Sequence, residues 1–356
     1  MSSIINGKNI KISIFGQSHS EAIGCVIDGL PAGIAIDMDN VREFMQRRAP
    51  GKNEFSTQRS EDDEVEILSG IADGVTCGAP LCGIIKNKNQ HSKDYSSLKF
   101  TPRPSHADLG NFVKTNGAND IRGGGHSSGR LTAPLCFAGA IAMQILNTYG
   151  VNVYAHIYSL AGINDTAFDP LKLEYQGIDK AKFPVIDQQI GEQMQSAILQ
   201  ARDMGDSVGG IIECGITGVP CGVGDPIFDG VENKLSANIF GIPAVKGIEF
   251  GAGFDLANMM GSTANDEFSY DENGTPITLS NNNGGILGGI TTGMPIIFRV
   301  VIKPTPSIYK EQQTINLKDG TNTTLLISGR HDPCIVQRAV PVVEAVSAIT
   351  MLDFIL

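Results

Sequence analysis

Polar and apolar residues alternate over several short stretches of the chain, which is the pattern of a strand with one buried face. The first stretch ends at a polar turn that contains Gln17, Ser18 and His19. Glycine, proline and other turn residues bound most of the remaining stretches. The pattern predicts strands over residues 11–15, 24–28, 64–70, 81–88, 151–159, 208–215, 245–250 and 296–302.

Other stretches repeat apolar residues at helical spacing, every three to four positions. Asp37 stands at the N-cap of the first, and Pro50 followed by Gly51 ends it. The stretch 128–149 is apolar on most sides, so we expect a central helix that tolerates Pro134 within its first two turns. The spacing predicts helices over residues 37–48, 108–114, 128–149, 188–204, 233–239, 256–261 and 337–354.

Two pairs of glycine-containing segments resemble each other across the chain. Residues 25–33 resemble residues 212–222, and residues 74–81 resemble residues 289–296, in the same order in both halves. This order favours an internal duplication, with two similar α/β halves that share one core. Chance matches among 42 glycines are the alternative. Because no Pro/Ser-rich linker divides the halves, we predict one domain over residues 1–356.

Composition limits the class of protein. The chain has 356 residues, of which 41% are hydrophobic, so it can bury a sizeable core. A formal net charge of −11 argues against nucleic-acid binding. We find neither about 18 continuous apolar residues, as a membrane span needs, nor a basic start followed by an apolar block, as a secretory signal needs. Seven cysteines without a Cys-x-x-Cys pair favour free thiols in a reducing cytoplasm.

A run of three glycines, Gly123 to Gly125, is the most distinctive stretch, and it precedes the central apolar helix. Glycine allows close backbone approach, and the start of a helix attracts anions. Arg122 and Arg130 flank the run, which suggests a phosphate or carboxylate site; a plain turn with a serine N-cap is the alternative. Seven of the eleven arginines lie in Gly-, Pro- or Ser-rich stretches, namely Arg47, Arg48, Arg59, Arg103, Arg122, Arg130 and Arg330.

Four of the six histidines stand in polar, turn-like sequence: His19, His106, His126 and His331. The other two, His91 and His156, look incidental. A metal site is poorly supported because no two histidines have helical or finger spacing. A Ser-His-Asp site is also poorly supported, because the sequence Gly-x-Ser-x-Gly is absent. Near the C-terminus, Asp332 before Pro333 is either a helix N-cap or a proton acceptor beside His331.

Seven motifs in register from residue 10 to 350 together resemble the chorismate synthase family. They are Gly16–Ser20, Arg103–Asp108, Arg122–Arg130, Ala244–Glu249, Asn283–Gly289, Lys303–Thr305 and Gly329–Cys334. The resemblance implies a shikimate-pathway lyase that converts 5-enolpyruvylshikimate 3-phosphate to chorismate and phosphate. The implied reaction is a 1,4-anti elimination that needs reduced FMN although no net redox change occurs.

The resemblance also implies roles for single residues. His19 would protonate the departing phosphate, with Ser18 beside it, and His106 would protonate or hold the flavin. Asp332 would act with flavin N5 to remove the ring proton, and Ser127 would lie against flavin and substrate. The implied flavin-binding residues are His126, Ser127, Ser128, Pro243, Ala244, Gly288, Lys303, Pro304, Thr305, Pro306, Ser307 and Arg330. The implied substrate- or NADP-binding residues are Arg48, Arg59, Arg103 and Arg130, of which Arg48 and Arg130, together with Arg330, would neutralise the phosphate and two carboxylates.

The chain departs from the family pattern at a few of these positions. Gln17 stands where the family usually has glutamate, and Ser20 stands where it often has glycine. His126 stands where the family usually has arginine, and Leu131 stands where it usually has glutamate. Glu54 stands where many members have an arginine linked with NADPH. This puts NADPH binding in doubt, so we predict that an external system supplies reduced FMN.

The sequence interpretation is a single α+β domain, an α/β sandwich of mixed, mainly antiparallel sheets packed with helices. From the family we expect a homotetramer, and we expect a cytoplasmic protein with no nucleic-acid or membrane partner. Two other functions share some of these features. An NADPH-dependent flavin reductase would need the flavin loops but not three substrate arginines, and a non-catalytic phosphometabolite-binding protein would need the arginines but not the histidines.

Overall fold

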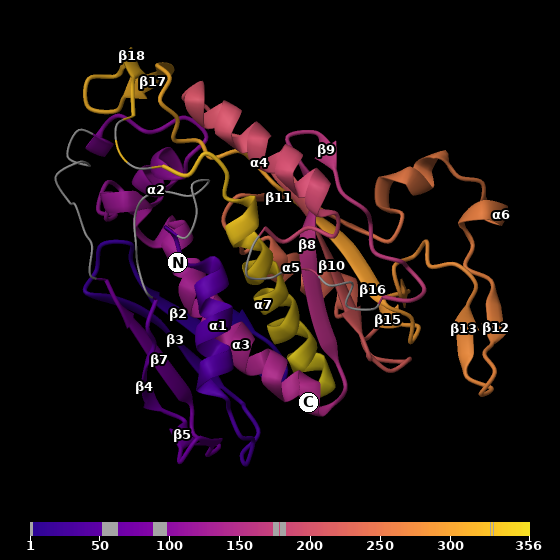
Figure 1. The fold of residues 1–356 in the computed structure, drawn as a ribbon. Coiled ribbons are helices and arrows are strands. Elements are labelled where there is room, and N and C mark those ends of the chain that lie inside the picture. The colour runs from indigo at the N-terminus through magenta and orange to yellow at the C-terminus, as the bar shows by residue number, and fades with distance from the viewer. Residues whose placement is uncertain are drawn as a thin grey trace.

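Two antiparallel sheets of five strands each form the framework of the part of the chain that the structure describes (Figure 1). This computed structural model describes residues 3–51, 63–87, 98–173, 178, 183–327, 329 and 331–356. The first sheet has the order β1 (Ile4–Asn6), β2 (Lys11–Gly16), β3 (Ala22–Asp28), β7 (Leu81–Lys86), β4 (Glu66–Ser69). The second has the order β11 (Val245–Phe250), β16 (Ile296–Ile302), β10 (Gly210–Thr217), β8 (Asn152–Leu160), β9 (Ile163–Asn164).

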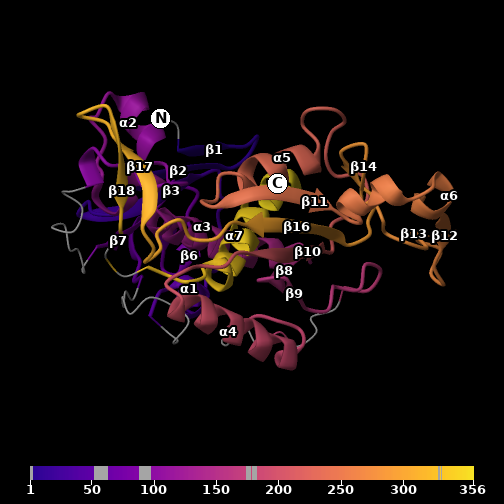
Figure 2. The same cartoon turned by 90° about the horizontal axis from the view of Figure 1, so that it is seen from above.

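Helices α3 (Thr132–Thr148) and α7 (Val336–Ile355) lie between the two sheets (Figures 1 and 2). They approach closely at Gly139, where a Cβ atom would stand 2.2 Å from Cβ of Ala345. Phe137 on α3 packs against the first sheet, because a Cβ at Gly83 of β7 would meet its ring at 2.5 Å. One hydrophobic cluster includes side chains from both sheets and both helices. The predicted α+β architecture with mainly antiparallel sheets is therefore confirmed.

The remaining helices lie around this framework. They are α1 (Met38–Arg48), α2 (Asp108–Thr115), α4 (Gln188–Asp203), α5 (Val231–Ile239) and α6 (Gly261–Ala264), with 3₁₀ segments η2 (Arg122–Ser127), η3 (Gly129–Leu131) and η4 (Gly253–Asn258). Four hairpins complete the elements described: β5 (Ile71–Ala72) with β6 (Val75–Thr76), β12 (Phe268–Tyr270) with β13 (Pro276–Thr278), β14 (Ile286–Leu287) with β15 (Ile290–Thr291), and β17 (Gln312–Asn316) with β18 (Thr321–Leu325).

The two halves pair their strands in the same register. In the first sheet Ile27 of β3 faces Leu81 of β7, and in the second Ile216 of β10 faces Ile296 of β16. These four residues occupy matching positions in the repeated segments of the sequence. In both sheets the strand order is also the same, since β2-β3-β7-β4 corresponds to β8-β10-β16-β11.

The turns that follow the matching strands share a side-chain hydrogen-bond pattern. The hydroxyl of Thr76 donates to the carbonyl of the turn proline at 2.7 Å and accepts from the Ile34 amide at 3.0 Å. The hydroxyl of Thr291 donates to its own turn proline at 2.6 Å and accepts from the Val223 amide at 3.0 Å. Shared register, strand order and turn chemistry support the predicted internal duplication over chance similarity.

One predicted helix is wrong in form. Over residues 256–261 the chain makes the end of the 3₁₀ segment η4 and only the first residue of the short helix α6. A regular helix needs an apolar stripe to bury, whereas Met259 and Met260 are exposed here. Figure 1 shows this region, with β12 and β13, projecting away from the sheets.

The stretch Gly129–Thr148 is long and apolar enough to cross a membrane by length and composition alone, but 72% of its most apolar window is buried inside the protein. Figure 2 shows α3 surrounded by other elements. Such burial is what a core helix of a folded domain shows.

Candidate active site

The three consecutive glycines form a loop that only glycine adopts without strain. Gly123, Gly124 and Gly125 have φ angles of 64°, 109° and 56°. A Cβ on Gly123 would lie 2.5 Å from Oγ of Ser18 and 2.6 Å from Cε1 of His19. The loop therefore touches the first histidine motif directly, and no side chain fits between them.

The same loop reaches the second histidine motif. A Cβ on Gly124 would lie 3.3 Å from Cε1 of His106 and 3.6 Å from Cβ of Ser128. The carbonyl of Gly125 accepts a hydrogen bond from the Ser18 amide at 3.0 Å. His19, His106 and Ser128 come from three separate segments, and the glycine loop brings them together.

His106 is held by a carboxylate that is itself held by an arginine. Its Nδ1 lies 2.7 Å from Oδ1 of Asp108. Nε and Nη2 of Arg103 donate to the two oxygens of the same carboxylate at 2.7 and 2.8 Å. Burial alone would raise the pKa of Asp108, but hydrogen bonds from Arg103 and His106 outweigh it and hold the pKa well below its usual range. An ionised Asp108 fixes the ring so that Nε2 faces the glycine loop.

Arg103 itself is 5% exposed and engaged by Asp108. This geometry supports a role in orienting His106 more than the predicted contact with substrate or NADP. Ser127 is also engaged within the chain, because its Oγ accepts from Nδ2 of Asn111 on α2 at 2.9 Å.

His126 uses both ring nitrogens inside the protein. Nδ1 lies 2.7 Å from the carbonyl oxygen of Gly16, and Nε2 lies 2.5 Å from Oγ of Ser3. Since a carbonyl only accepts, Nδ1 is the donor. The imidazole joins the glycine loop to strand β2, which gives the predicted flavin contact of His126 no support.

The Lys303 segment packs against the His106 loop. Nζ of Lys303 donates to the carbonyl of Ser105, and the Lys303 amide donates to the carbonyl of Ala244 at 3.0 Å. Burial, with a smaller effect of Lys246, lowers the pKa of Lys303. The hydroxyl of Thr305 is buried and has no hydrogen-bond partner among the described residues. A polar ligand group would satisfy it.

The other predicted flavin residues divide into two groups. Pro304, Pro306 and Ser307 lie in the Lys303 segment, and Ser307 is buried. Pro243 precedes Ala244, whose φ of 74° marks a tight turn next to Lys303. Gly288, by contrast, lies in the turn of the β14–β15 hairpin. Figures 1 and 2 both place that hairpin on the opposite side of the molecule from α2.

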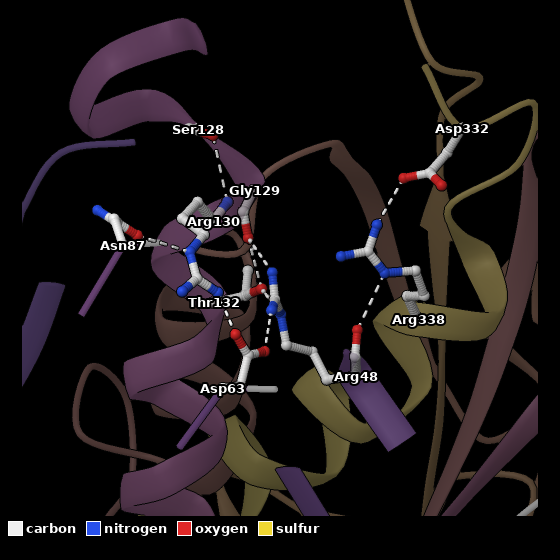
Figure 3. Close-up of polar contacts among 9 residues, drawn as sticks. All are labelled: Arg48, Asp63, Asn87, Ser128, Gly129, Arg130, Thr132, Asp332 and Arg338. Carbon is white, nitrogen blue, oxygen red and sulfur yellow. Dashed lines mark hydrogen bonds and ion pairs between the residues drawn. The ribbon is translucent and has the colours of Figure 1, made fainter. Parts of the chain in front are cut away.

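Two of the predicted substrate arginines share one buried carboxylate (Figure 3). Arg48 at the end of α1 and Arg130 before α3 both form ion pairs with Asp63, through different carboxylate oxygens. Arg48 is 3% exposed and Arg130 is 6% exposed. Burial alone would raise the pKa of Asp63, but the two guanidinium groups outweigh it and lower the pKa.

Asp332 is held by an arginine that the sequence reasoning had not singled out. Nη1 of Arg338 donates to Oδ2 of Asp332 at 2.5 Å, and Nε of Arg338 donates to the main-chain oxygen of Arg48 at 2.9 Å. The alternative of Asp332 as a helix N-cap is wrong, because α7 begins after Ile335, which makes no side-chain cap. Arg59, Arg330, Glu54 and His91 lie outside the described residues.

Sequence reasoning missed the carboxylates and the arginine that position the predicted groups, namely Asp63, Asp108 and Arg338. Asp108 carried a usable signal, because it ends the Arg103–Asp108 motif two residues after His106. The other two join their partners only through tertiary structure.

The fold and the site define an α+β protein with a buried arginine pair that shares one carboxylate and with histidines held beside a glycine loop. A family model described as chorismate synthase matches residues 10–356, so the chain belongs to the chorismate synthase family. It is 47% identical over 351 residues to a chorismate synthase of Dehalococcoides mccartyi, covering 98% of this chain and 96% of that protein. A chorismate synthase of Methanosarcina acetivorans is 44% identical over 359 residues, covering 100% of this chain and 97% of that protein.

A solved crystal structure of chorismate synthase has the same fold, with a TM-score of 0.76 at 26% identity, covering 98% of this chain and 92% of that one. The family assignment confirms that the chain is an enzyme, a carbon–oxygen lyase of the shikimate pathway, as the resemblance implied.

Proposed function

We propose that this chain converts 5-enolpyruvylshikimate 3-phosphate to chorismate and phosphate in a 1,4-anti elimination that depends on reduced FMN. The C–O bond to phosphate breaks and a ring C–H proton is lost, without net redox change. The observation that carries the proposal is the glycine loop, which contacts both His19 and His106 within a chain of this family.

His19 serves as the acid for the departing phosphate. It is 5% exposed, and Ser18 beside it is 2% exposed, so a proton held there is shielded from bulk water. Phosphate leaves more easily when it is protonated or ion-paired, and a positioned histidine is a common general acid. Arg48 and Arg130 supply the ion pairing, because buried guanidinium groups bind phosphate and carboxylate strongly.

Asp332 serves as the acceptor for the ring proton. Its carboxylate is fixed by Arg338, which also contacts the main chain of Arg48. Arg338 therefore connects the proposed proton acceptor to the segment that carries one of the proposed anion-binding arginines (Figure 3).

The residues present fit a flavin phosphate and ring edge. Thr305 has a buried hydroxyl without a partner in the described part of the chain, and Lys303 beside it provides a cation with a lowered pKa. Lys303 and Thr305 would hold the cofactor, with His106 facing it from the loop that Lys303 contacts. Reduced FMN, when bound, supplies transient electron density to the substrate. His106, oriented by Asp108, holds or donates a proton from Nε2.

The assembly and the surroundings of the enzyme are part of the same proposal. The projecting region, residues 253–278, carries the exposed apolar side chains of Phe254, Met260, Phe268 and Tyr270, which suit burial against other copies in a homotetramer. We propose a single-domain, cytoplasmic enzyme that receives reduced FMN from an external system. Sedimentation equilibrium at several concentrations measures the subunit number, and a monomer throughout would contradict the tetramer.

An anaerobic assay tests the function. Purified protein, reduced FMN and the substrate are mixed, and chorismate absorbance and released phosphate are followed together. Equal amounts of both products are expected. NADPH oxidation without phosphate release would instead favour a flavin reductase. A second arm replaces reduced FMN by oxidised FMN and NADPH in air; sustained turnover there would show that no external reductant is needed.

A further inference from the structure

Asp63 occupies a position that no motif assigned. Its side chain is completely buried, and its two carboxylate oxygens face guanidinium groups from two different elements (Figure 3). Oδ2 accepts from Nη1 of Arg48, and Oδ1 accepts from Nη1 of Arg130. One carboxylate therefore fixes the relative placement of two arginines that are 82 positions apart (130 − 48) in the sequence.

Three further contacts of the two arginines in the described part of the chain go to neutral acceptors. Nε of Arg48 donates to Oγ1 of Thr132 at 3.0 Å, and its Nη2 lies 3.4 Å from the carbonyl of Gly129. Nε of Arg130 donates to Oδ1 of Asn87 at 3.0 Å. These contacts fix the planes of both guanidinium groups, but they provide no charge to balance them. Asp63 is the carboxylate that the described contacts place on both.

Charge explains why such a residue is needed. Two buried guanidinium groups repel each other, and burial of an unbalanced charge is costly. One shared carboxylate lowers this repulsion, because it pairs with both guanidinium groups at once.

We propose that Asp63 is the positioning residue for Arg48 and Arg130, holding them as one preformed site for an acidic group of the substrate. This inference rests on the proposed function, because it takes the substrate to be an organic phosphate that also carries carboxylates. Asp63 touches no substrate itself; it acts through the two arginines.

The backbone at Asp63 decides which substitution tests the idea. Its φ angle is 50°, a left-handed conformation that aspartate and asparagine tolerate better than other non-glycine residues. Asp63→Asn therefore keeps the size and the backbone preference, and it removes the charge together with one of the two acceptor oxygens. Asp63→Glu keeps the charge but moves it by one methylene, so it serves as the conservative variant. Asp203→Asn, at an exposed carboxylate on α4, is the matched control.

The experiment measures kcat and KM for the substrate in the anaerobic assay, together with Tm. We expect Asp63→Asn to raise KM at least tenfold and to change kcat less than threefold, because a saturating anion can itself bring the arginines together. Asp63→Glu should recover part of the loss, and Asp203→Asn should match the wild type. A lowered KM in Asp63→Asn would overturn the proposal, since Asp63 would then compete with the substrate. A lower Tm with unchanged KM would also overturn it, leaving a purely structural role.

Binding separates this proposal from the proposed function. Calorimetric titration with the substrate, without flavin, needs no turnover. If the wild type binds the substrate but forms no chorismate, the proposed function fails while the role of Asp63 is still measured as a tenfold or greater loss of affinity in Asp63→Asn. Equal affinity in wild type and variant would refute the positioning role whatever the turnover. If Asp63→Asn does not fold, the same comparison is made with Asp63→Glu, for which a threefold or larger loss is expected.

Discussion

Gly123 and His19 are in such close contact that a single methyl group on the glycine would overlap the imidazole. The ideal Cβ position on Gly123 is 2.6 Å from Cε1 of His19, and the φ of 64° adds backbone strain for any other residue. Gly123→Ala should therefore displace His19 and lower kcat at least tenfold. The left-handed backbone adds a stability cost of roughly 1–2 kcal/mol.

The control for this variant is Gly110→Ala. Gly110 lies on the exposed side of helix α2, and a Cβ there meets nothing within 4 Å. Alanine is the better helix former, so this variant should be as active as wild type and slightly more stable. Steady-state kinetics and thermal unfolding are measured on both. Normal kcat in Gly123→Ala would mean that the position of His19 does not limit turnover.

Asp332 and His106 are the other two groups that we propose to transfer or hold protons. Asp332→Asn removes the proposed proton acceptor but keeps its size, and His106→Ala removes the ring that Asp108 orients. Each should lower turnover at least tenfold, because general acid–base groups contribute roughly a hundredfold or more. Asp229→Asn, at an exposed carboxylate paired with Lys234, is the control and should leave turnover unchanged. Near-normal turnover in either site variant would remove that residue's assigned role.

The sequence predicted regular elements well where one face of an element is buried. Strands β11 and β16 match their predicted ranges of 245–250 and 296–302, and α1 begins after its predicted cap, where Asp37 accepts from two amides. The β17–β18 hairpin was not predicted. Its residues are mostly glutamine, threonine and asparagine, so no apolar alternation marks it.

The site could be predicted only as far as its motifs extend. Sequence motifs predicted His19, His106 and Asp332 as site residues, but several of the residues that contact the predicted groups come from elsewhere in the chain. Arg338 contacts Arg48 across 290 positions, and Asp63 contacts Arg130 across 67. A lone acidic or basic residue in a polar or helical stretch gives no local signal of such a partner.

His156 shows the same limit, because its position in a predicted strand indicated only an incidental residue. It is completely buried between two carboxylates, with Nδ1 3.3 Å from Asp165 and Nε2 3.0 Å from Glu213. Arg299 adds a further charge, since its Nε donates to Glu213 at 2.9 Å. Burial alone would lower the pKa of His156, but the two carboxylates outweigh it and raise the pKa.

This network should make stability depend on pH in a defined direction. Below its unfolded pKa of about 6.5 His156 contributes its full stability, and the contribution is lost as pH rises through the raised folded pKa. The pKa of Asp165 is lowered, with burial opposing and His156 and backbone amides favouring the shift, so its contribution is lost as pH falls below about 3.9. The network is therefore strongest between about pH 4 and 6.5.

His156→Gln tests this assignment by urea unfolding at several pH values. The variant removes the cation that pairs with Asp165 and leaves Glu213 paired with Arg299. It should lose about 3–5 kcal/mol near pH 6. The difference from wild type should shrink as pH rises, because wild-type His156 loses its proton there. A difference that stays constant from pH 6 to 9 would contradict a charged His156 in the folded protein.

The internal repeat leads to a prediction about two threonines that lie in different sheets. Thr76 and Thr291 are each 2% exposed and make equivalent hydrogen bonds in equivalent turns. Thr→Val keeps the shape but leaves a buried amide and a carbonyl without their partner, so each variant should lose about 1–3 kcal/mol. Because the two sites share no partner, the double variant should lose the sum to within about 0.5 kcal/mol.

Thr148→Val, at an exposed residue whose hydroxyl donates to the Ile145 carbonyl, is the control and should change stability by less than about 0.5 kcal/mol. Urea unfolding measures all four, and a large effect at one turn with none at the other would show that the repeat is preserved in geometry but not in energy.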